Sequence, residues 1–495
     1  MNALNRKLLR DLWRLRGQVL AIAMVVASGV AVLVMSLATL SSLQETAFTY
    51  YERYRFADIF ASVTRAPEQL AARIADIPGV QHAETRISKL ATLDMAGFEE
   101  PVIGQLVSIP EHGESVLNRL ALLAGRRVQP DRPDEVVLSE PFAEAHGLTP
   151  GSRLHAIING KRRALHVVGI ALSPEYVYAI GPGALMPDNQ RFGVLWMGRK
   201  ALAAAYDLDG AFNDIALSLL HGTQPASVIQ PLDQLLARYG GSGAIARADQ
   251  LSNWFLMNEI DQLGTMARIL PTIFLVVAAF LTNMVLARII ATERSEIGLM
   301  KAFGYRSTEI GWHYARMVIA ITGVGIVLGW LIGAWFGKVS TELYAEFYRF
   351  PLLIFAPKPS SFAAGALVSL GAALAGTLGS MRRAASLPPA EAMRPPSPPL
   401  YRRTRLSTSR IAAWLDQPTR IILRQIVRWP GRALLTSAGI GLSGGVLVME
   451  LQWIDSVMHI VRVSVYDTQG LVMRVGRGER ESSPGADVDG ERPGG

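Results

Sequence analysis

Five long apolar runs, each nearly free of charge, divide the 495-residue chain. They cover about residues 18–40, 269–290, 317–337, 361–380 and 433–454. Each run has about the 20 residues that a helix needs to cross a hydrocarbon core of ~30 Å. The pattern therefore predicts an α-helical transmembrane protein with about five spans.

The segment between the first two runs, residues 45–264, has the mixed pattern of a soluble domain. Strand-like runs occur at residues 58–63, 86–93, 135–138, 153–158 and 165–170. Residues 67–77 have apolar side chains at helical spacing. Asn159-Gly160 separates the last two strand-like runs and is a strong hairpin signal. We therefore expect a large α+β domain between spans one and two, with a β-rich insert.

Charge supports a membrane location and indicates an orientation. Only 18% of residues are charged, against roughly 25% in a typical soluble protein. The net charge of +8 comes from basic residues beside the apolar runs, which the positive-inside rule explains better than nucleic-acid binding does. Arg6, Arg10 and Arg14 share one face of a predicted interfacial helix. The first run is too long for a signal peptide, so we expect an uncleaved anchor with a cytoplasmic N-terminus.

A second basic stretch lies near the C-terminal end. Eleven arginines stand against two acidic residues between positions 382 and 432. This bias places the stretch in the cytoplasm. Contact with anionic lipid headgroups is a sufficient role for it.

The sequence lacks the groups that catalysis would require. Without cysteine there is no thiolate nucleophile or thiolate metal site. Five histidines in the 45–264 segment are scattered and show no metal-ligand spacing: His82, His112, His146, His155 and His166. The phosphate-binding pattern Gly-x-x-x-x-Gly-Lys-[Ser/Thr] is absent as well. We expect a non-catalytic chain without a metal, and any ATP would be hydrolysed by a separate protein.

Two further stretches suggest contacts. Residues 173–183 form an aromatic, glycine-containing loop that could contact a cargo or partner, or equally be a packed domain edge. In the third span, glycine recurs every four residues, at Gly325, Gly329, Gly333 and Gly337. Such a stripe predicts a face on which another helix packs closely.

The most informative stretch follows the second span, at residues 291–306. Read as a helix, it places Arg294 and Lys301 on one side. Its opposing apolar arc consists of Ile297, Leu299, Met300 and Phe303. Gly304 is placed to end the helix in a left-handed conformation. The stretch is either a solvated turn or a docking helix whose apolar arc enters a groove on a cytoplasmic partner.

The same stretch resembles the "ER…EIG..KA.G" signature of FtsX-like permeases. The resemblance rests on Glu293, Arg294, Glu296, Ile297, Gly298, Lys301, Ala302 and Gly304. This family contains the membrane subunits of macrolide exporters and of lipoprotein-release ABC systems, the mechanotransmission transporters. The start of the 45–264 segment resembles the family's periplasmic core domain, and residues 384–395 resemble its "A..P.EALR" segment. The resemblance implies that the signature residues, Ala302 apart, dock a separate ATPase subunit.

The implied function is that of a permease subunit in the bacterial inner membrane. ATP hydrolysis by a separate cytoplasmic ABC ATPase would drive movement of the periplasmic domain, for export or extraction of a substrate. Membrane lipids and a periplasmic adaptor are further expected partners, and nucleic acid is not. The alternative is a membrane signalling or regulatory protein that relays an extracytoplasmic state, for example to a cell-wall hydrolase.

The chain also contains the beginning of an internal repeat. Residues 9–35 align without gaps with residues 423–449, and Val32-Leu33-Val34-Met35 recurs in full. We expect a second module that is truncated early, and a homodimer if the chain is naturally half-size. The expected segments are 1–44 (interfacial helix and first span), 45–264 (periplasmic domain), 265–395 (three-span module), 396–422 (Pro/Arg-rich linker), 423–469 (second module and fifth span) and 470–495 (disordered tail).

Overall fold

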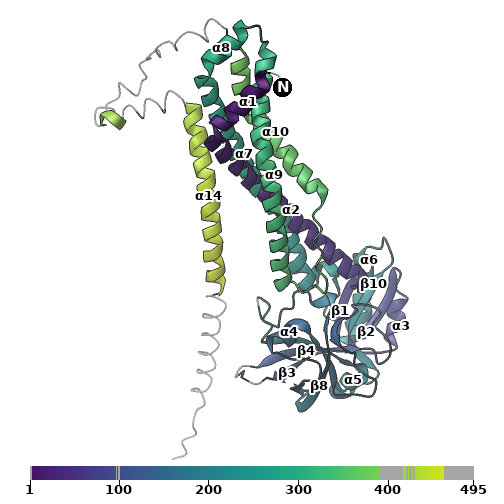
Figure 1. The fold of residues 1–495 in the computed structure, drawn as a ribbon. Helices are drawn as coiled ribbons and strands as arrows, with labels where there is room; N and C mark the ends of the chain where they lie inside the picture. Colours follow the sequence, from purple (N-terminus) through teal and green to yellow (C-terminus); the bar gives the residue numbers. More distant parts are fainter. Residues whose placement is uncertain are drawn as a thin grey trace, which may run out of the picture. The chain divides into compact units, whose positions relative to one another are not determined.

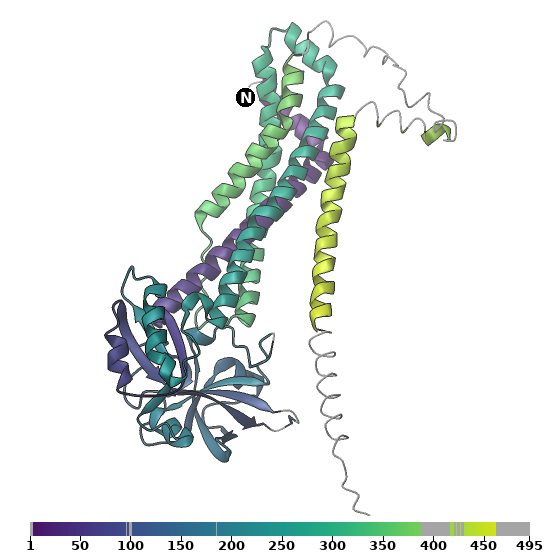
Figure 2. The ribbon, with the colours of Figure 1, turned by 180° about the vertical axis from the view of Figure 1, so that it is seen from behind.

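The computed structural model describes residues 3–95, 97–98, 101–184, 186–386, 388, 416–419, 422, 426 and 430–461. The chain divides into two units, Met1–Pro389 and Ala390–Gly495. In the first unit a helical bundle carries an α+β domain (Figures 1 and 2). The second unit contains helix α14 (Pro430–Val461). The predicted tail and most of the predicted linker lie outside the described residues.

Among the described residues, four helices are long and apolar enough to cross a membrane. They are α2 (Arg16–Arg53), α7 (Leu251–Thr292), α9 (Ser307–Phe347) and α10 (Pro359–Ser386). They cover the first four predicted runs, which confirms the transmembrane class. Helix α14 covers the fifth run, and its crossing of a membrane stays a prediction.

Three of these helices are much longer than a membrane crossing. With 38, 42 and 41 residues, α2, α7 and α9 are roughly 57–63 Å long at a rise of 1.5 Å per residue. The hydrocarbon core accounts for only ~30 Å of that length. Helices α2 and α7 therefore continue into the predicted 45–264 segment, and Figure 1 shows them reaching the α+β domain.

The bundle is held together by close helix packing. Helix α2 packs against α7 and α9, and α10 packs against the same two helices. The four glycines of the stripe on α9 face α2: Gly325, Gly329, Gly333 and Gly337. A Cβ atom at Gly329 would lie 2.6 Å from Val30 Cβ, and one at Gly333 would lie 2.8 Å from the Ala31 carbonyl oxygen. Only glycine permits this approach of the two helices.

The α+β domain contains two sheets, the first with four antiparallel strands. Its order is β11 (Ile245–Ala246), β1 (Ile59–Pro67), β10 (Ala211–Leu219) and β2 (Val80–Arg86). Helices α3 (Leu70–Ala75) and α6 (Pro225–Leu236) contribute to its core. Ile74 of α3 and Leu232 of α6 are fully buried there with Phe212 of β10.

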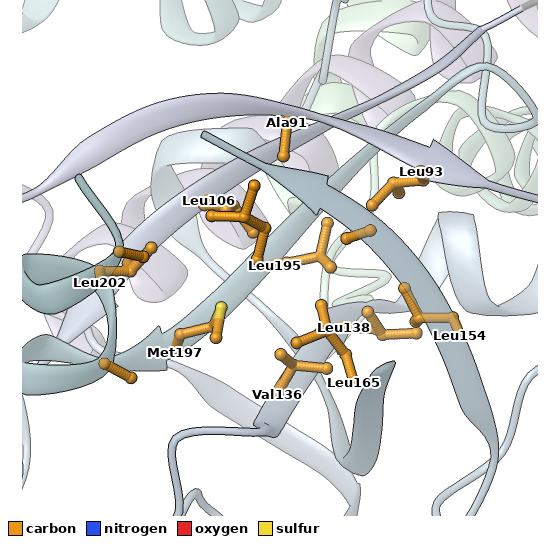
Figure 3. Close-up of a cluster of buried hydrophobic side chains, with 14 of the residues drawn as sticks. Ala91, Leu93, Leu106, Val136, Leu138, Leu154, Leu165, Leu195, Met197 and Leu202 are labelled. Atoms are coloured by element: carbon orange, nitrogen blue, oxygen red, sulfur yellow. The ribbon is translucent and has the colours of Figure 1, made fainter. Parts of the chain in front are cut away.

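The second sheet has seven strands. Its order is β5 (Ala121–Gly125), β8 (Lys161–Leu172), β6 (Glu135–Ser139), β9 (Phe192–Gly198), β4 (Val102–Ile109), β3 (Ser88–Asp94) and β7 (Arg153–Ile158). Because β7 also pairs with β8, six of the strands close into a ring. Leu106, Leu138, Leu165 and Leu195 fill its interior (Figure 3). Two short helices, α4 (Glu140–Ala145) and α5 (Arg199–Tyr206), contact strands of this sheet.

The predicted hairpin between β7 and β8 is confirmed. These strands pair antiparallel up to Ile158 and Lys161. Asn159 and Gly160 both have positive φ angles, 48° and 75°. A two-residue turn with this geometry is the type that asparagine-glycine favours.

An aromatic cluster joins the α+β domain to the outer ends of the long helices. Tyr178 stacks on Tyr348, just after α9, at 5.1 Å between ring centroids, and also contacts Phe255 of α7. In the preceding residues, Pro174 and Glu175 are buried. This part of the aromatic loop is therefore a packed domain edge, the second of the two roles considered for it.

A buried ion cluster links the two sheets. The Arg86 guanidinium of β2 donates to Glu175 at 2.6 Å and to Asp214 of β10 at 2.8 Å. Asn118 also donates to Glu175, at 2.9 Å. Burial would lower the pKa of Arg86, but the negative charges of Asp214 and Glu175 outweigh it and hold that pKa above its ordinary value.

Candidate functional site at the α8 end of the bundle

The predicted helix after the second span is present as α8 (Arg294–Ala302). It follows α7 after a break at Glu293, whose φ and ψ angles of −91° and 15° are not helical. Gly304 lies just beyond its C-terminal end with a φ angle of 92°, which confirms the left-handed ending. The amide of Tyr305 closes this end by donating to the Met300 carbonyl at 3.1 Å.

The apolar arc of α8 is divided between two environments. Ile297 is fully buried and packs in the bundle core, and Met300 packs against the same core. Leu299 and Phe303 remain 50% and 76% exposed. The predicted arc is therefore not one continuous docking surface, because its first part anchors α8 to the bundle and only the second part is open.

A charge cluster fixes the N-terminal end of α8 to helix α1 (Ala3–Arg14). The Lys7 ammonium of α1 lies 2.7 Å from Asp11, 3.1 Å from Glu293 and 2.8 Å from Glu296. The Tyr314 hydroxyl of α9 donates to Glu293 at 3.1 Å. Three chain segments thus meet at one small group of polar side chains.

The pKa values of this cluster reflect the pairing. Burial alone would lower the pKa of Lys7, but the hydrogen bonds to Asp11 and Glu296 and the charge of Glu293 outweigh it, so the pKa is raised. The hydrogen bond from Lys7 lowers the pKa of Glu296. Both groups are therefore charged near neutral pH, and the pair is an ion pair.

The opposite end of α8 is tied to α10. The Lys301 ammonium donates to the Ala385 carbonyl oxygen at 2.8 Å, in the last turn of that helix. A lysine at this position suits the negative end of the helix dipole. Lys301 therefore has an intramolecular partner.

The other proposed docking residues lie in varied surroundings. Gly298 is buried, Arg294 is half-buried and Gly304 is exposed. Five of the proposed docking residues therefore contact the rest of the bundle: Glu293, Glu296, Ile297, Gly298 and Lys301. Docking of a partner by the signature residues stays a prediction.

The contribution of Lys7, Asp11 and Tyr314 to this cluster was not predicted from the sequence. A local signal existed for two of them, because Asp11 is the only acidic residue among residues 1–17 and follows Lys7 by one helical turn. No local pattern indicates that position 7 meets position 293, so the long-range contact was not predictable.

The described residues also form pockets away from α8. A cavity of about 320 Å³ lies where α2 enters the α+β domain and includes His82, and another of about 260 Å³ includes His112. An apolar groove of about 570 Å³ runs between α9 and α10 past Trp312 and Met381. No group of three potential metal ligands occurs among the described residues.

Comparison with protein families identifies the class of the membrane part. Residues 268–389 match the family model described as FtsX-like permease C-terminal. The match spans most of α7 and all of α8, α9 and α10, so this part of the chain is similar to the C-terminal domain of FtsX-like permeases. The resemblance recognised in the α8 sequence is confirmed. Together with the four candidate spans, the match makes the chain similar to FtsX-like permeases in its membrane part.

Solved structures show weaker likenesses. The extracellular domain of the noncanonic ABC-type transporter YknZ from Gram-positive bacteria has 13% identity and a TM-score of 0.27, covering 38% of this chain and 98% of that one. The periplasmic region of MacB from Actinobacillus actinomycetemcomitans has 12% identity and a TM-score of 0.27, covering 43% and 97%. A domain of a putative permease protein from Porphyromonas gingivalis has 13% identity and a TM-score of 0.25, covering 41% and 97%. No curated protein sequence matches significantly. Likenesses at this level support no conclusion about function.

Proposed function

We propose that this chain is the permease subunit of an ABC transporter whose separate cytoplasmic ATPase docks on α8. The observation that carries the proposal is the pair of exposed apolar side chains, Leu299 and Phe303, on a helix otherwise fixed to the bundle. A short helix held rigidly at both ends can present such side chains to a groove without the entropic cost of becoming ordered on binding.

The helices offer a continuous route from α8 to the α+β domain. Helix α8 follows α7 directly, and α7 runs without interruption from Leu251 to Thr292. Helix α9 packs tightly on α2 through its glycine stripe. Both α2 and α7 reach the aromatic cluster at the base of the domain. Movement of α8 driven by ATP hydrolysis would therefore move the α+β domain, for export or extraction of a substrate.

The proposed location is the bacterial inner membrane, with the N-terminus in the cytoplasm and the α+β domain in the periplasm. The basic residues of α1 and the arginines after α10 support this orientation. ATP would be bound by the partner ATPase. Membrane lipids and a periplasmic adaptor are the other proposed partners.

The docking proposal is tested by replacing Phe303 or Leu299 with aspartate. A charged side chain at the centre of an apolar contact should weaken capture of the ATPase by about 2 kcal/mol or more, roughly 30-fold. The measurement is co-purification with the ATPase from the native membrane, followed by titration of the purified subunits. These positions are preferable to Gly298, because a bulky residue at that buried position would also displace α8.

Met186→Asp provides the matched control, since Met186 is an exposed apolar residue of the α+β domain. It should capture the ATPase normally. If Phe303→Asp and Leu299→Asp also bind the ATPase with unchanged affinity, α8 is not the docking site.

A further inference from the structure

Helix α1 has two chemically different faces, and the inner one packs on the bundle. Leu8 and Leu12 of α1, and Leu15 just after it, contact the apolar core that also contains Ile297 of α8. Lys7 lies on the same side and contacts Glu293 and Glu296. The inner face therefore joins α1 to the docking helix through both apolar and ionic contacts.

The outer face of α1 is exposed. Arg16 lies over its Trp13 ring, 5.8 Å from the ring centroid, and the charges of Arg10 and Arg14 help to lower the pKa of Glu296. Leu9 and Trp13 are 59% and 74% exposed. Arg6, Arg10 and Arg14 are exposed as well and make no hydrogen bond or ion pair within the described part of the chain. The five positions recur at intervals of three or four residues, so they form one continuous helical face.

The composition of this face fits an anionic phospholipid surface. Helix α1 ends at Arg14, immediately before α2 begins its course into the membrane, so α1 lies at the level of the headgroups. An apolar and aromatic pair can enter the boundary between headgroups and acyl chains, while the arginines pair with lipid phosphates. The absence of acidic side chains from this face favours anionic over zwitterionic lipid.

We propose that α1 senses the anionic lipid of the adjacent leaflet and, through Lys7, orders the docking helix α8. Binding of the outer face holds α1 in one position on the bundle. Lys7 then holds Glu293 and Glu296 and with them the N-terminal end of α8. A leaflet poor in anionic lipid releases α1 and leaves α8 more mobile. The consequence for ATPase coupling rests on the proposed function, but the coupling between lipid and α8 does not.

The test measures the mobility of α8 in the full chain without any ATPase. Because the sequence has no cysteine, Ala302→Cys supplies a single site for a spin label on the exposed side of α8. The labelled chain is placed in nanodiscs of phosphatidylcholine with increasing fractions of phosphatidylglycerol. We expect the rotational mobility of the label to fall about twofold as the anionic fraction rises.

Three variants distinguish the binding of lipid by α1 from the effect of that binding on α8. Replacing Arg6, Arg10 and Arg14 with glutamine should abolish the lipid dependence of label mobility. Lys7→Met should abolish it too, because the link to α8 is lost. The part of the tryptophan quenching by brominated phosphatidylglycerol that Trp13→Phe removes should remain in Lys7→Met, because the outer face is intact. Glu296→Gln, which removes only the most exposed partner of Lys7, should reduce the dependence without unfolding the cluster.

Lys338→Gln is the matched control, since Lys338 is an exposed basic residue in the outer half of α9 and pairs with Glu342 of the same helix. It should keep the full lipid dependence. The proposal is wrong if the wild-type label has the same mobility at every phosphatidylglycerol fraction. It is also wrong if Lys7→Met, with α1 bound to lipid, retains the wild-type response. If the wild-type chain shows the lipid response but binds no ATPase, the proposed function is wrong and the coupling between lipid and α8 still holds.

Discussion

At the residue scale, the buried Arg86 cluster shows how a single charge can hold two sheets together. Arg86 lies in the four-stranded sheet, and Glu175 follows β8 of the seven-stranded sheet. With Arg86 removed, the buried carboxylate of Glu175 and the half-buried carboxylate of Asp214 would be left without their cation. Breaking a buried ion pair in this way typically costs about 3–5 kcal/mol.

We therefore expect Arg86→Met to lower the free energy of unfolding of the α+β domain by about 3–5 kcal/mol. Arg162→Met is the matched control, because Arg162 forms a 2.6 Å ion pair with Asp94 at an exposed position. That pair should contribute less than about 1 kcal/mol. Urea unfolding of the full chain, followed by hydrogen exchange in the domain, measures both values. Equal effects of the two variants would contradict a cross-linking role for Arg86.

The residues predicted correctly are those whose conformation is fixed locally. Asn159-Gly160 and Gly304 need positive φ angles, and a short sequence window is enough to indicate this. The Lys7 cluster was not predicted because its members are close only after the bundle has formed. Lys301 illustrates the same limit, since its partner at Ala385 is 84 positions away.

At the element scale, the glycine stripe of α9 determines how closely that helix approaches α2. Replacing Gly329 with leucine would place side-chain atoms where Val30 and the Ala27 carbonyl already lie. Because the contact includes backbone, rotation of a side chain cannot relieve it. Overpacking of this kind costs about 1–3 kcal/mol or more.

We therefore expect Gly329→Leu to lower the thermal stability of the purified chain in detergent. Gly323→Leu is the control on the same helix, since nothing lies within 4 Å of a Cβ atom at that position. Its unfolding temperature should stay close to that of the wild type. An unchanged unfolding temperature for Gly329→Leu would show that α9 and α2 do not rely on this contact.

Helix existence was predictable from hydropathy, but helix length was not. The apolar runs indicate only the residues inside the hydrocarbon core. Beyond it, residues such as Tyr50 and Leu256 continue α2 and α7 because they pack against the α+β domain. Closure of the seven-stranded sheet was also missed, because the pairing of β7 with both β3 and β8 follows from tertiary packing and not from any one strand.

At the scale of the whole molecule, the fold does not determine the orientation in the membrane. The distribution of basic residues predicts it instead. The α8 end of the bundle collects the basic residues of α1, together with Arg382 and Arg383 near the end of α10. The α+β domain lies at the other end of the long helices (Figure 2). By the positive-inside rule, we predict that the α8 end is cytoplasmic and that the domain is periplasmic.

Single cysteines at Pro150 and Arg306 test this orientation, because the sequence contains no other thiol. Both positions are exposed, Pro150 before β7 in the α+β domain and Arg306 between α8 and α9. In intact cells, a membrane-impermeant thiol reagent should label position 150 and spare position 306. Permeabilised cells should show labelling at both, which controls for reactivity. Labelling of position 306 with protection of position 150 in intact cells would reverse the topology and place α8 out of reach of any cytoplasmic ATPase. The docking proposal depends on this outcome, so the labelling experiment should precede the others.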